Sequence, residues 1–187
     1  EARTCLIVGG GQVALRKALW LLACGARIKV ISPEIDRELE ALARREPEKV
    51  MLRREAYSSH ELADGLARYQ LVIAATNLDE LNRSVAEDAQ RAGVMVNIVD
   101  RPELCTFFVP AVVQREDLQI AVSTSGAAPS LAGRIRGELE QQYPTWYGVY
   151  TAALGIVRRE AIDRRLNPSA THDLLNHLAS KDIAERL

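Results

Sequence analysis

The sequence has no excess of charge of either sign, and this absence narrows the class of protein. It holds 24 basic and 25 acidic residues, for a formal net charge of −1. Proteins that bind nucleic acids usually carry a basic excess or a basic stripe. Segments that bind acidic membrane surfaces carry clusters of lysine and arginine. We therefore expect neither a nucleic acid nor a membrane as a partner.

Long apolar runs, paired cysteines and clustered histidines are also missing. No run approaches the roughly 20 apolar residues that span a bilayer, and the chain leads directly into a predicted strand, so we expect no signal peptide. The three cysteines are scattered without a Cys-x-x-Cys pair, which favours reduced thiols in a cytoplasmic protein. No metal site is expected, because His60 is isolated and His172 and His177 would point apart on one helix.

What is present is an alternation of short apolar runs and amphipathic segments. The runs predict strands at residues 4–8, 27–31, 50–53, 71–75 and 94–99. Helices are predicted between them at residues 13–24, from Pro33 through Leu42, from Ser59 through Leu66, and at 78–92. This alternation predicts βαβ units and a parallel sheet covered on both faces. The right-handed crossover rule then favours a Rossmann-type sheet with strand order 3-2-1-4-5.

The pattern changes after Pro102. Residues 106–109 and 118–122 predict two more strands joined by a turn at 114–117, and helices are expected at 129–142, 145–166 and 171–187. The predicted fold class is α/β: a Rossmann-type parallel sheet, a small α+β segment and a C-terminal helical domain. The expected domain boundaries are 1–105, 106–143 and 144–187.

A glycine-rich segment stands between the first predicted strand and the first predicted helix. Residues 9–14 read GGGQVA and fit G-x-G-x-x-A, which is the dinucleotide-binding fingerprint in this context. Gly9 permits the tight turn, and Gly11 lets the backbone approach a pyrophosphate. Gln12 and Val13 begin the helix, whose free N–H groups and positive dipole end would receive the phosphates. The alternative is a glycine turn that binds no ligand.

One usual companion of this motif is missing. NAD-binding domains commonly place Asp or Glu at the end of the second strand for the ribose, whereas residues 30–33 read VISP. Ser32 is the candidate that remains for the ribose, and Arg37 lies a helical turn further on. Since nothing here favours the 2′-phosphate of NADP, we predict NAD. Thr76 and Asn77, after the fourth predicted strand, are assigned to the cofactor wall, with ordinary turn residues as the alternative.

Several short segments, in order, resemble one family. In the first half they read CLIVGGG at residues 5–11, VA at 13–14, RKA at 16–18 and AAT at 74–76. They continue with NIVD at 97–100, FFVP at 107–110 and AVSTSG at 121–126, followed by Pro129 and LA at 131–132. The set is similar to the precorrin-2 dehydrogenase/ferrochelatase family, which includes the N-terminal half of trifunctional sirohaem synthase. It covers about residues 3 to 140. The remaining helices match in general character only.

The resemblance implies an activity that the glycines alone do not. Precorrin-2, a tetrapyrrole rich in carboxylates, would lose a hydride to NAD and become sirohydrochlorin. Some members of the family also insert ferrous iron into sirohydrochlorin to give sirohaem. The resemblance further implies a homodimer, with residues 106–143 as the dimerisation segment and the active site in a cleft near the dinucleotide.

Asp100 is the catalytic candidate. It follows the fifth predicted strand in the segment NIVD, and the matching aspartate of the family is credited with both reactions. One carboxylate could accept the proton lost during dehydrogenation and the pyrrole protons lost when iron enters. The alternative is an aspartate that caps the turn before Pro102.

Hydroxyl residues precede the helix predicted at 129–142. Ser123, Thr124 and Ser125 are candidates for binding substrate carboxylates, with N-capping as the alternative. The family often has Ser-Ser-Gly-Gly here, so Thr124 and Ser125 depart from its pattern. Arg134 is a further candidate for the substrate, and Arg136 faces another side of the helix.

A different class of function is also compatible with the fold. Nucleotide-sensing regulatory modules, such as the gating domains of potassium channels, also begin with a Rossmann half. They normally keep the acidic residue after the second strand, which is absent here, and they lack a helical tail. A third interpretation is a non-catalytic interaction domain that kept only the fold.

Overall fold

The computed structural model describes residues 3–63 and 69–184, which fall into two units. The first unit is Glu1–Phe108 and the second is Val109–Leu187. In these described ranges, no helix has the length and apolar character needed to cross a membrane. The further division expected near residue 143 stays a prediction.

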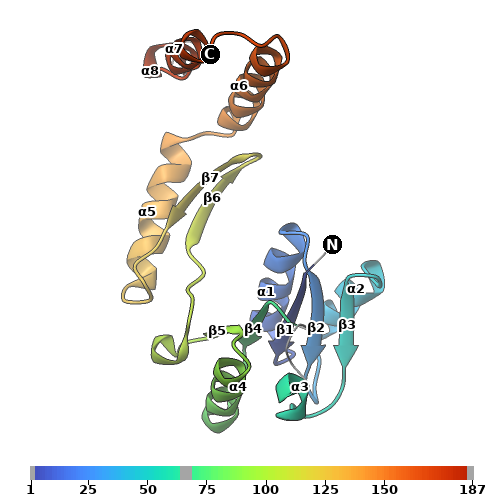
Figure 1. Cartoon of the computed structure of the whole chain (residues 1–187). Coiled ribbons are helices and arrows are strands. Elements are labelled where there is room, and N and C mark those ends of the chain that lie inside the picture. Colours follow the sequence, from blue (N-terminus) through green and yellow to red (C-terminus); the bar gives the residue numbers. More distant parts are fainter. Residues whose placement is uncertain (1–2, 64–68, 185–187) are drawn as a thin grey trace. The chain divides into compact units, whose positions relative to one another are not determined.

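A parallel sheet of five strands forms the centre of the first unit (Figure 1). Its spatial order is β3-β2-β1-β4-β5, which confirms the predicted order. The strands are β1 Thr4–Val8, β2 Arg27–Ile31, β3 Val50–Arg53, β4 Leu71–Ala74 and β5 Met95–Ile98. The helices between them are α1 Gln12–Ala23, α2 Arg37–Arg45, α3 His60–Ala63 and α4 Asp79–Arg91. Residues 64–66 of the helix predicted after Ser59 lie outside the described part of the chain.

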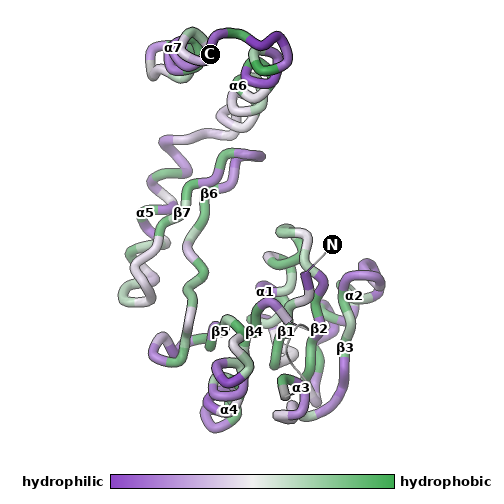
Figure 2. The backbone as a smooth tube through the Cα atoms, viewed as in Figure 1, coloured by the Kyte–Doolittle hydropathy of each residue, from purple (hydrophilic) through white to green (hydrophobic). Residues whose placement is uncertain are grey.

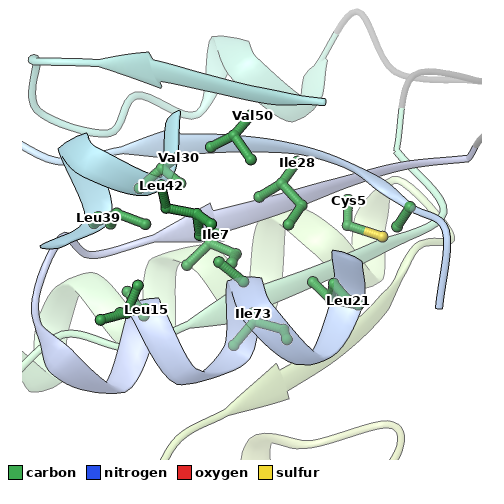
Figure 3. Packing of buried hydrophobic residues seen from close by; sticks show 13 residues of the cluster. Cys5, Ile7, Leu15, Leu21, Ile28, Val30, Leu39, Leu42, Val50 and Ile73 are labelled. Atoms are coloured by element: carbon green, nitrogen blue, oxygen red, sulfur yellow. The ribbon is translucent and has the colours of Figure 1, made fainter. Parts of the chain in front are cut away.

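The sheet is buried on both faces, as the near-continuous apolar runs predicted. One face packs against α1 and α2 through a cluster that includes Ile7, Leu15 and Leu39 (Figure 3). The other packs against α4 through a cluster that includes Leu6 and Val85. The hydrophobic colour in Figure 2 follows the strands, whereas α2 and α4 carry hydrophilic residues. Each fully buried aliphatic side chain contributes roughly 1.5–3 kcal/mol, so the sheet is a stable platform for the loops at its edge.

The start of α2 differs from the sequence prediction. Pro33 was expected at the first helical position, but α2 begins at Arg37. Asp36 is its N-cap, and its Oδ1 atom accepts a hydrogen bond from the backbone N–H of Glu38 at 2.8 Å. The backbone N–H of Asp36 also donates to the carbonyl oxygen of Gly10 at 2.8 Å. A capping carboxylate and a contact with the glycine loop therefore outweigh the preference of proline for the first helical turn.

The second unit consists of a hairpin and helices. Strands β6 Ala111–Arg115 and β7 Leu118–Val122 pair antiparallel, and α5 Pro129–Gln142 contacts both of them. The later helices are α6 Trp146–Asp163, α7 Pro168–Leu178 and α8 Lys181–Ala184. The helix predicted at 171–187 is thus wrong at its start, because α7 begins three residues earlier, at Pro168. Asn167 is its N-cap, and its side chain accepts a hydrogen bond from the N–H of Ser169. The predicted helix is also interrupted between α7 and α8.

The strand predicted at residues 106–109 is wrong. The first strand of the hairpin begins at Ala111, and the turn predicted at 114–117 shortens to Glu116 and Asp117. Thr106 instead lies beside the last strand of the first unit, where its N–H donates to the carbonyl oxygen of Val96 at 2.8 Å. An apolar run was therefore misassigned because its hydrogen-bonding partner is β5, which sequence periodicity does not reveal.

Candidate functional site

The glycine loop between β1 and α1 is shaped by close contacts of its backbone. Gly9 has a φ of +115°, and a Cβ atom there would lie 2.3 Å from the carbonyl oxygen of Ala75. A Cβ atom at Gly10 would lie 2.0 Å from the carbonyl oxygen of Glu34. At Gly11 no protein atom lies within 4 Å of the Cβ position. The packing of the protein therefore explains the first two glycines, whereas the open side of Gly11 suits the approach of a ligand, as predicted.

The N-terminus of α1 is available to an anion. Gly11 is its N-cap, no side chain caps the helix, and the first turn holds no acidic residue. The amide of Gln12 points elsewhere, since its Nε2 atom donates to Asp36 Oδ2 at 3.0 Å and Glu38 Oε2 at 3.1 Å. Binding of a pyrophosphate by the backbone N–H groups at Gln12 and Val13 stays a prediction.

A cavity of about 760 Å³ opens beside this loop, within the size range of small-molecule sites. It brings together five of the predicted cofactor residues, namely Gly9, Gly11, Ser32, Thr76 and Asn77. Gln12 and Val13, the other two, are not among its lining residues. The carboxyl ends of β1, β2 and β4 meet here, which is where parallel sheets of this class bind nucleotides.

Thr76 has a structural task of its own. Its hydroxyl group is 2.7 Å from Asn82 Oδ1 and accepts a hydrogen bond from the N–H of Leu78 at 3.2 Å. Asn82 in turn donates to the carbonyl oxygen of Thr76 at 3.1 Å. Thr76 therefore anchors the turn before α4 while it lines the cavity, and the exposed Asn77 carries the side chain that a ligand can reach.

Two carboxylates line the cavity that the sequence analysis did not assign to it. They are Glu34 and Asp36, which follow β2 by three and five residues. The acids that the strand end lacks thus stand in the loop that packs on Gly10. The N-cap pattern of Asp36 before α2 was the available signal, but it indicates a helix start and not a cavity wall. Arg37 does not line the cavity.

The loop after β3 supplies another wall through Tyr57. Its hydroxyl donates to Asp88 Oδ2 at 2.9 Å, and burial followed by this hydrogen bond raises the pKa of Tyr57 well above its ordinary value. Asp88 also pairs with Arg91, 2.5 Å away. Sequence reasoning missed Tyr57, because its partner lies 31 residues further along the chain.

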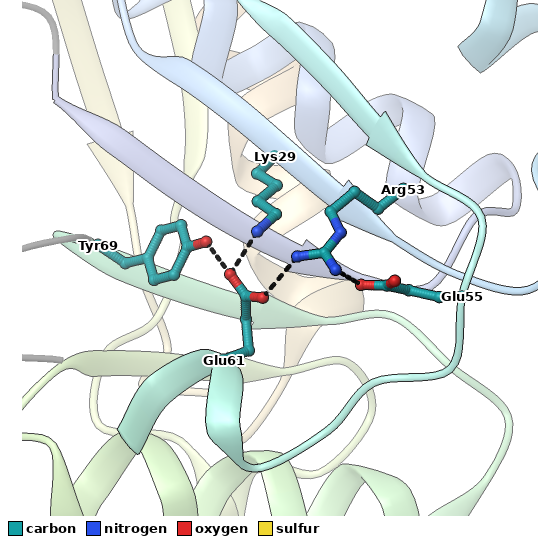
Figure 4. Close-up of polar contacts among 5 residues, drawn as sticks. All are labelled: Lys29, Arg53, Glu55, Glu61 and Tyr69. Carbon is teal, nitrogen blue, oxygen red and sulfur yellow. Dashed lines mark hydrogen bonds and ion pairs between the residues drawn. The ribbon is translucent and has the colours of Figure 1, made fainter. Parts of the chain in front are cut away.

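A buried ionic network holds the same loop to the sheet (Figure 4). Glu61 of α3 accepts hydrogen bonds from Lys29 of β2, from Tyr69 and from Arg53. The side chains of Lys29 and Glu61 are each 9% exposed. Burial raises the pKa of Glu61, but the hydrogen bonds and positive charges around it outweigh burial, so this pKa lies below its ordinary value. Arg53 also pairs with Glu55, and Arg54 with Glu40.

Asp100 occupies a strained turn at the end of β5. The N–H of Arg101 donates to the carbonyl oxygen of Ile98 at 3.3 Å, and Asp100 has a φ of +60°. This is the left-handed region, where turns normally place Gly or Asn. In the described part of the chain, the exposed carboxylate of Asp100 has no hydrogen-bond partner, and the N-cap of the short helix Pro102–Leu104 is Arg101. Among the described residues, Asp100 therefore makes none of the hydrogen bonds that the alternative interpretation as a cap requires.

Lys17 lies near Asp100. It belongs to the family segment RKA, and the sequence analysis assigned it no function. It is half-buried on α1, and burial, followed by repulsion from Arg16, lowers its pKa, while Cys105 and Asp100 act in the opposite direction. Among the described residues it forms no ion pair. A lysine in this state is suited to an acidic group of a ligand, and the fingerprint itself gives no signal for it.

The predicted substrate residues of the second unit are engaged within it. Ser123 Oγ accepts from the N–H of Ser125 at 3.1 Å, and Thr124 Oγ1 accepts from the N–H of Ala128 at 3.1 Å. These contacts lie within the loop before α5, whose N-cap is Ala128 and which has no side-chain cap, so the capping alternative is wrong. Arg134 pairs with Glu138 one turn along α5. A role for Ser123, Thr124, Ser125 and Arg134 in substrate binding stays a prediction.

Fold and site together define a Rossmann-type dinucleotide-binding protein. Residues 1–111 match the family described as putative NAD(P)-binding, and residues 115–142 match the one described as sirohaem biosynthesis protein central. The chain belongs to this putative NAD(P)-binding family, and the shorter match to the sirohaem biosynthesis protein central family follows directly after it. The predicted family, fold class and dinucleotide-binding domain are thereby confirmed.

Individual relatives agree with this assignment. A siroheme synthase of Pseudomonas putida (strain W619) is 47% identical over 147 residues, which are 79% of this chain and 30% of that protein. One of Saccharophagus degradans is 36% identical over 187 residues, 100% of this chain and 40% of that protein. The chain thus spans 30–40% of the length of these curated relatives. A solved structure named SirC, precorrin-2 dehydrogenase, aligns with a TM-score of 0.78 at 25% identity, covering 98% of this chain and 87% of that one.

Proposed function

We propose that the chain catalyses the NAD-dependent dehydrogenation of precorrin-2 to sirohydrochlorin, with Asp100 as general base. The observation that carries this proposal is the turn after β5, which holds an exposed carboxylate at a φ of +60°, with no hydrogen bond to it from residues 3–63 or 69–184. Strained backbone of this kind concentrates at functional sites. The family and the likeness to SirC support the same reaction.

The chemistry requires one proton and one hydride to leave the substrate. NAD, when bound, supplies the acceptor for the hydride. Asp100 accepts the proton, for which an ionised carboxylate with free lone pairs is suited. Lys17 attracts an acidic side chain of the tetrapyrrole toward Asp100, because a half-buried ammonium group that has no ionic partner in the described part of the chain gains most from a carboxylate.

We infer NAD, not NADP, as the cofactor from the charges around the cavity. Glu34 and Asp36 line it, and a carboxylate can accept hydrogen bonds from a ribose diol but repels a 2′-phosphate. The arginines of the neighbouring loop are occupied, since Arg53 pairs with Glu55 and Glu61, and Arg54 pairs with Glu40. Neither arginine is among the residues that line the cavity, whereas Glu34 and Asp36 are.

Three further parts of the proposal come from the resemblance to the family. Ferrous iron is a second substrate, with Asp100 accepting the pyrrole protons as the metal enters sirohydrochlorin. A homodimer and a cytoplasmic location complete the proposal. The free state of Cys5, Cys24 and Cys105 is compatible with a reducing compartment.

An anaerobic assay with precorrin-2 and NAD tests the activity through the absorbance of NADH. We expect turnover by the purified chain and its loss on omission of either reactant. Binding of NAD without turnover would favour the regulatory module instead. Replacing precorrin-2 by sirohydrochlorin and ferrous iron in a parallel assay tests the chelatase step.

A further inference from the structure

Strand β5 lies at the edge of the sheet. A short segment of the same unit covers its outer side. Thr106 donates its N–H to the carbonyl oxygen of Val96 at 2.8 Å, and its hydroxyl accepts from the N–H of Val96 at 2.8 Å. One position further on, Asn97 Nδ2 donates to the carbonyl oxygen of Phe107 at 3.1 Å. These bonds fix the segment that returns from the Asp100 turn, so that the turn is closed at its base.

Cys105 completes this closure with its side chain. The Sγ atom accepts hydrogen bonds from the N–H of Ile98 at 3.2 Å and from Asn97 Nδ2 at 3.6 Å. It also lies 3.3 Å from the carbonyl oxygens of both Ile98 and Arg101, and its one S–H group donates to either of them. A single side chain therefore bonds the backbone on both sides of Asp100.

The two residues whose backbone the thiol contacts are the ends of the Asp100 turn. Ile98 is its first residue and Arg101 its last, joined by the hydrogen bond of 3.3 Å between them. Asp79 at the start of α4 adds an ion pair to the Arg101 side chain. The carboxylate of Asp100, by contrast, is held by no hydrogen bond among the described residues, so its position depends on the backbone that carries it.

The thiol is in the form that this arrangement needs. Burial raises the pKa of Cys105 above its ordinary value, and the N–H of Ile98 acts in the opposite direction without reversing the shift. The group is therefore protonated near neutral pH and keeps the S–H that donates to a carbonyl oxygen. Cys105 is also free of any disulfide.

We propose that Cys105 is a positioning residue for Asp100, and that its hydrogen bonds to Ile98 and Arg101 hold the general base in its left-handed turn. The inference rests on the proposed function, because it gives Asp100 a catalytic task. Loss of these bonds frees the turn to relax toward ordinary backbone angles, which displaces the carboxylate from the reacting proton. A displacement of about 1 Å at a reacting group costs on the order of 100-fold in rate.

Variants of Cys105 in the full chain test this, with kcat, the KM for precorrin-2 and the Kd for NAD as readouts. We expect Cys105→Ala to lower kcat at least about tenfold, with the Kd for NAD unchanged because the glycine loop is untouched. Cys105→Ser should recover most of the rate, since a hydroxyl both donates and accepts. Cys24→Ala is the matched control, because that thiol is exposed at the end of α1, and should behave as wild type.

Three outcomes would overturn the inference. They are a wild-type kcat in Cys105→Ala, an equal loss in the Ala and Ser variants, and a rise in the Kd for NAD that accompanies the loss. If Cys105→Ala does not fold, Cys105→Val replaces it, and failure of both to fold shows a structural residue. A failure of the proposed function is distinguishable, because then Asp100→Asn would keep its turnover or wild type would show none.

Discussion

Replacing Asp100 by asparagine separates a catalytic group from a structural one. The substitution keeps the size of the side chain but removes the carboxylate that accepts a proton. We expect turnover with precorrin-2 to fall by roughly 10²–10⁴-fold, the usual contribution of a general base. The Kd for NAD should stay within about twofold of wild type, because the pyrophosphate site lies at the β1–α1 loop.

The stability of this variant provides a second measurement, which shows that any loss of rate does not come from misfolding. Asparagine tolerates a φ of +60° at least as well as aspartate, and the Asp100 carboxylate has no hydrogen bond to lose among the described residues. The free energy of unfolding should therefore change by less than about 0.5 kcal/mol. A capping role would also leave the stability nearly unchanged in this variant, because asparagine caps about as well as aspartate, so kcat separates the two roles. Steady-state kinetics are measured on a preparation whose thermal unfolding matches wild type, and a normal kcat in that preparation would refute the reasoning.

Four other substitutions probe the cofactor loop, the choice of cofactor and the buried ion pair. Gly10→Ala should destabilise the fold by about 1–3 kcal/mol in thermal unfolding, because the added Cβ would lie 2.0 Å from a backbone oxygen. Gly11→Val should leave the fold intact but raise the Kd for NAD steeply. An unchanged affinity for NAD would contradict the site. Wild type should prefer NAD to NADP in kcat/KM at least about tenfold, and Asp36→Asn should reduce this preference. A tenfold preference for NADP would be incompatible with a cavity wall that contains Glu34 and Asp36. Glu61→Gln should cost about 3 kcal/mol at neutral pH by leaving Lys29 without its buried counter-charge. The pKa of Glu61 is lowered in the folded protein. Its contribution to stability is therefore present above the unfolded pKa of about 4.3 and is lost as the pH falls through the folded pKa. Denaturant unfolding should show the free energies of unfolding of wild type and variant converging in acid.

Local patterns in the sequence were sufficient for the framework of the first unit. The buried strands read as apolar runs because both faces of a parallel sheet are covered, and short crossovers then leave few strand orders. The glycine fingerprint placed Gly9 and Gly11, and the strand end placed Asp100. Each of these features depends on residues within one strand–loop–helix unit, so the sequence alone determined them.

Tertiary structure decided which loops meet at the site. Asp36 and Tyr57 reach the cavity through contacts with Gly10 and Asp88, far from them in sequence. The segment at Thr106 became the cover of an edge strand and not a strand of the hairpin, because unpaired backbone groups of β5 took it as their partner. Periodicity reports which side of an element is buried, but not which distant backbone atom satisfies a hydrogen bond. That choice is made only when the chain is folded, since a buried polar group left without a partner costs more than a local propensity contributes.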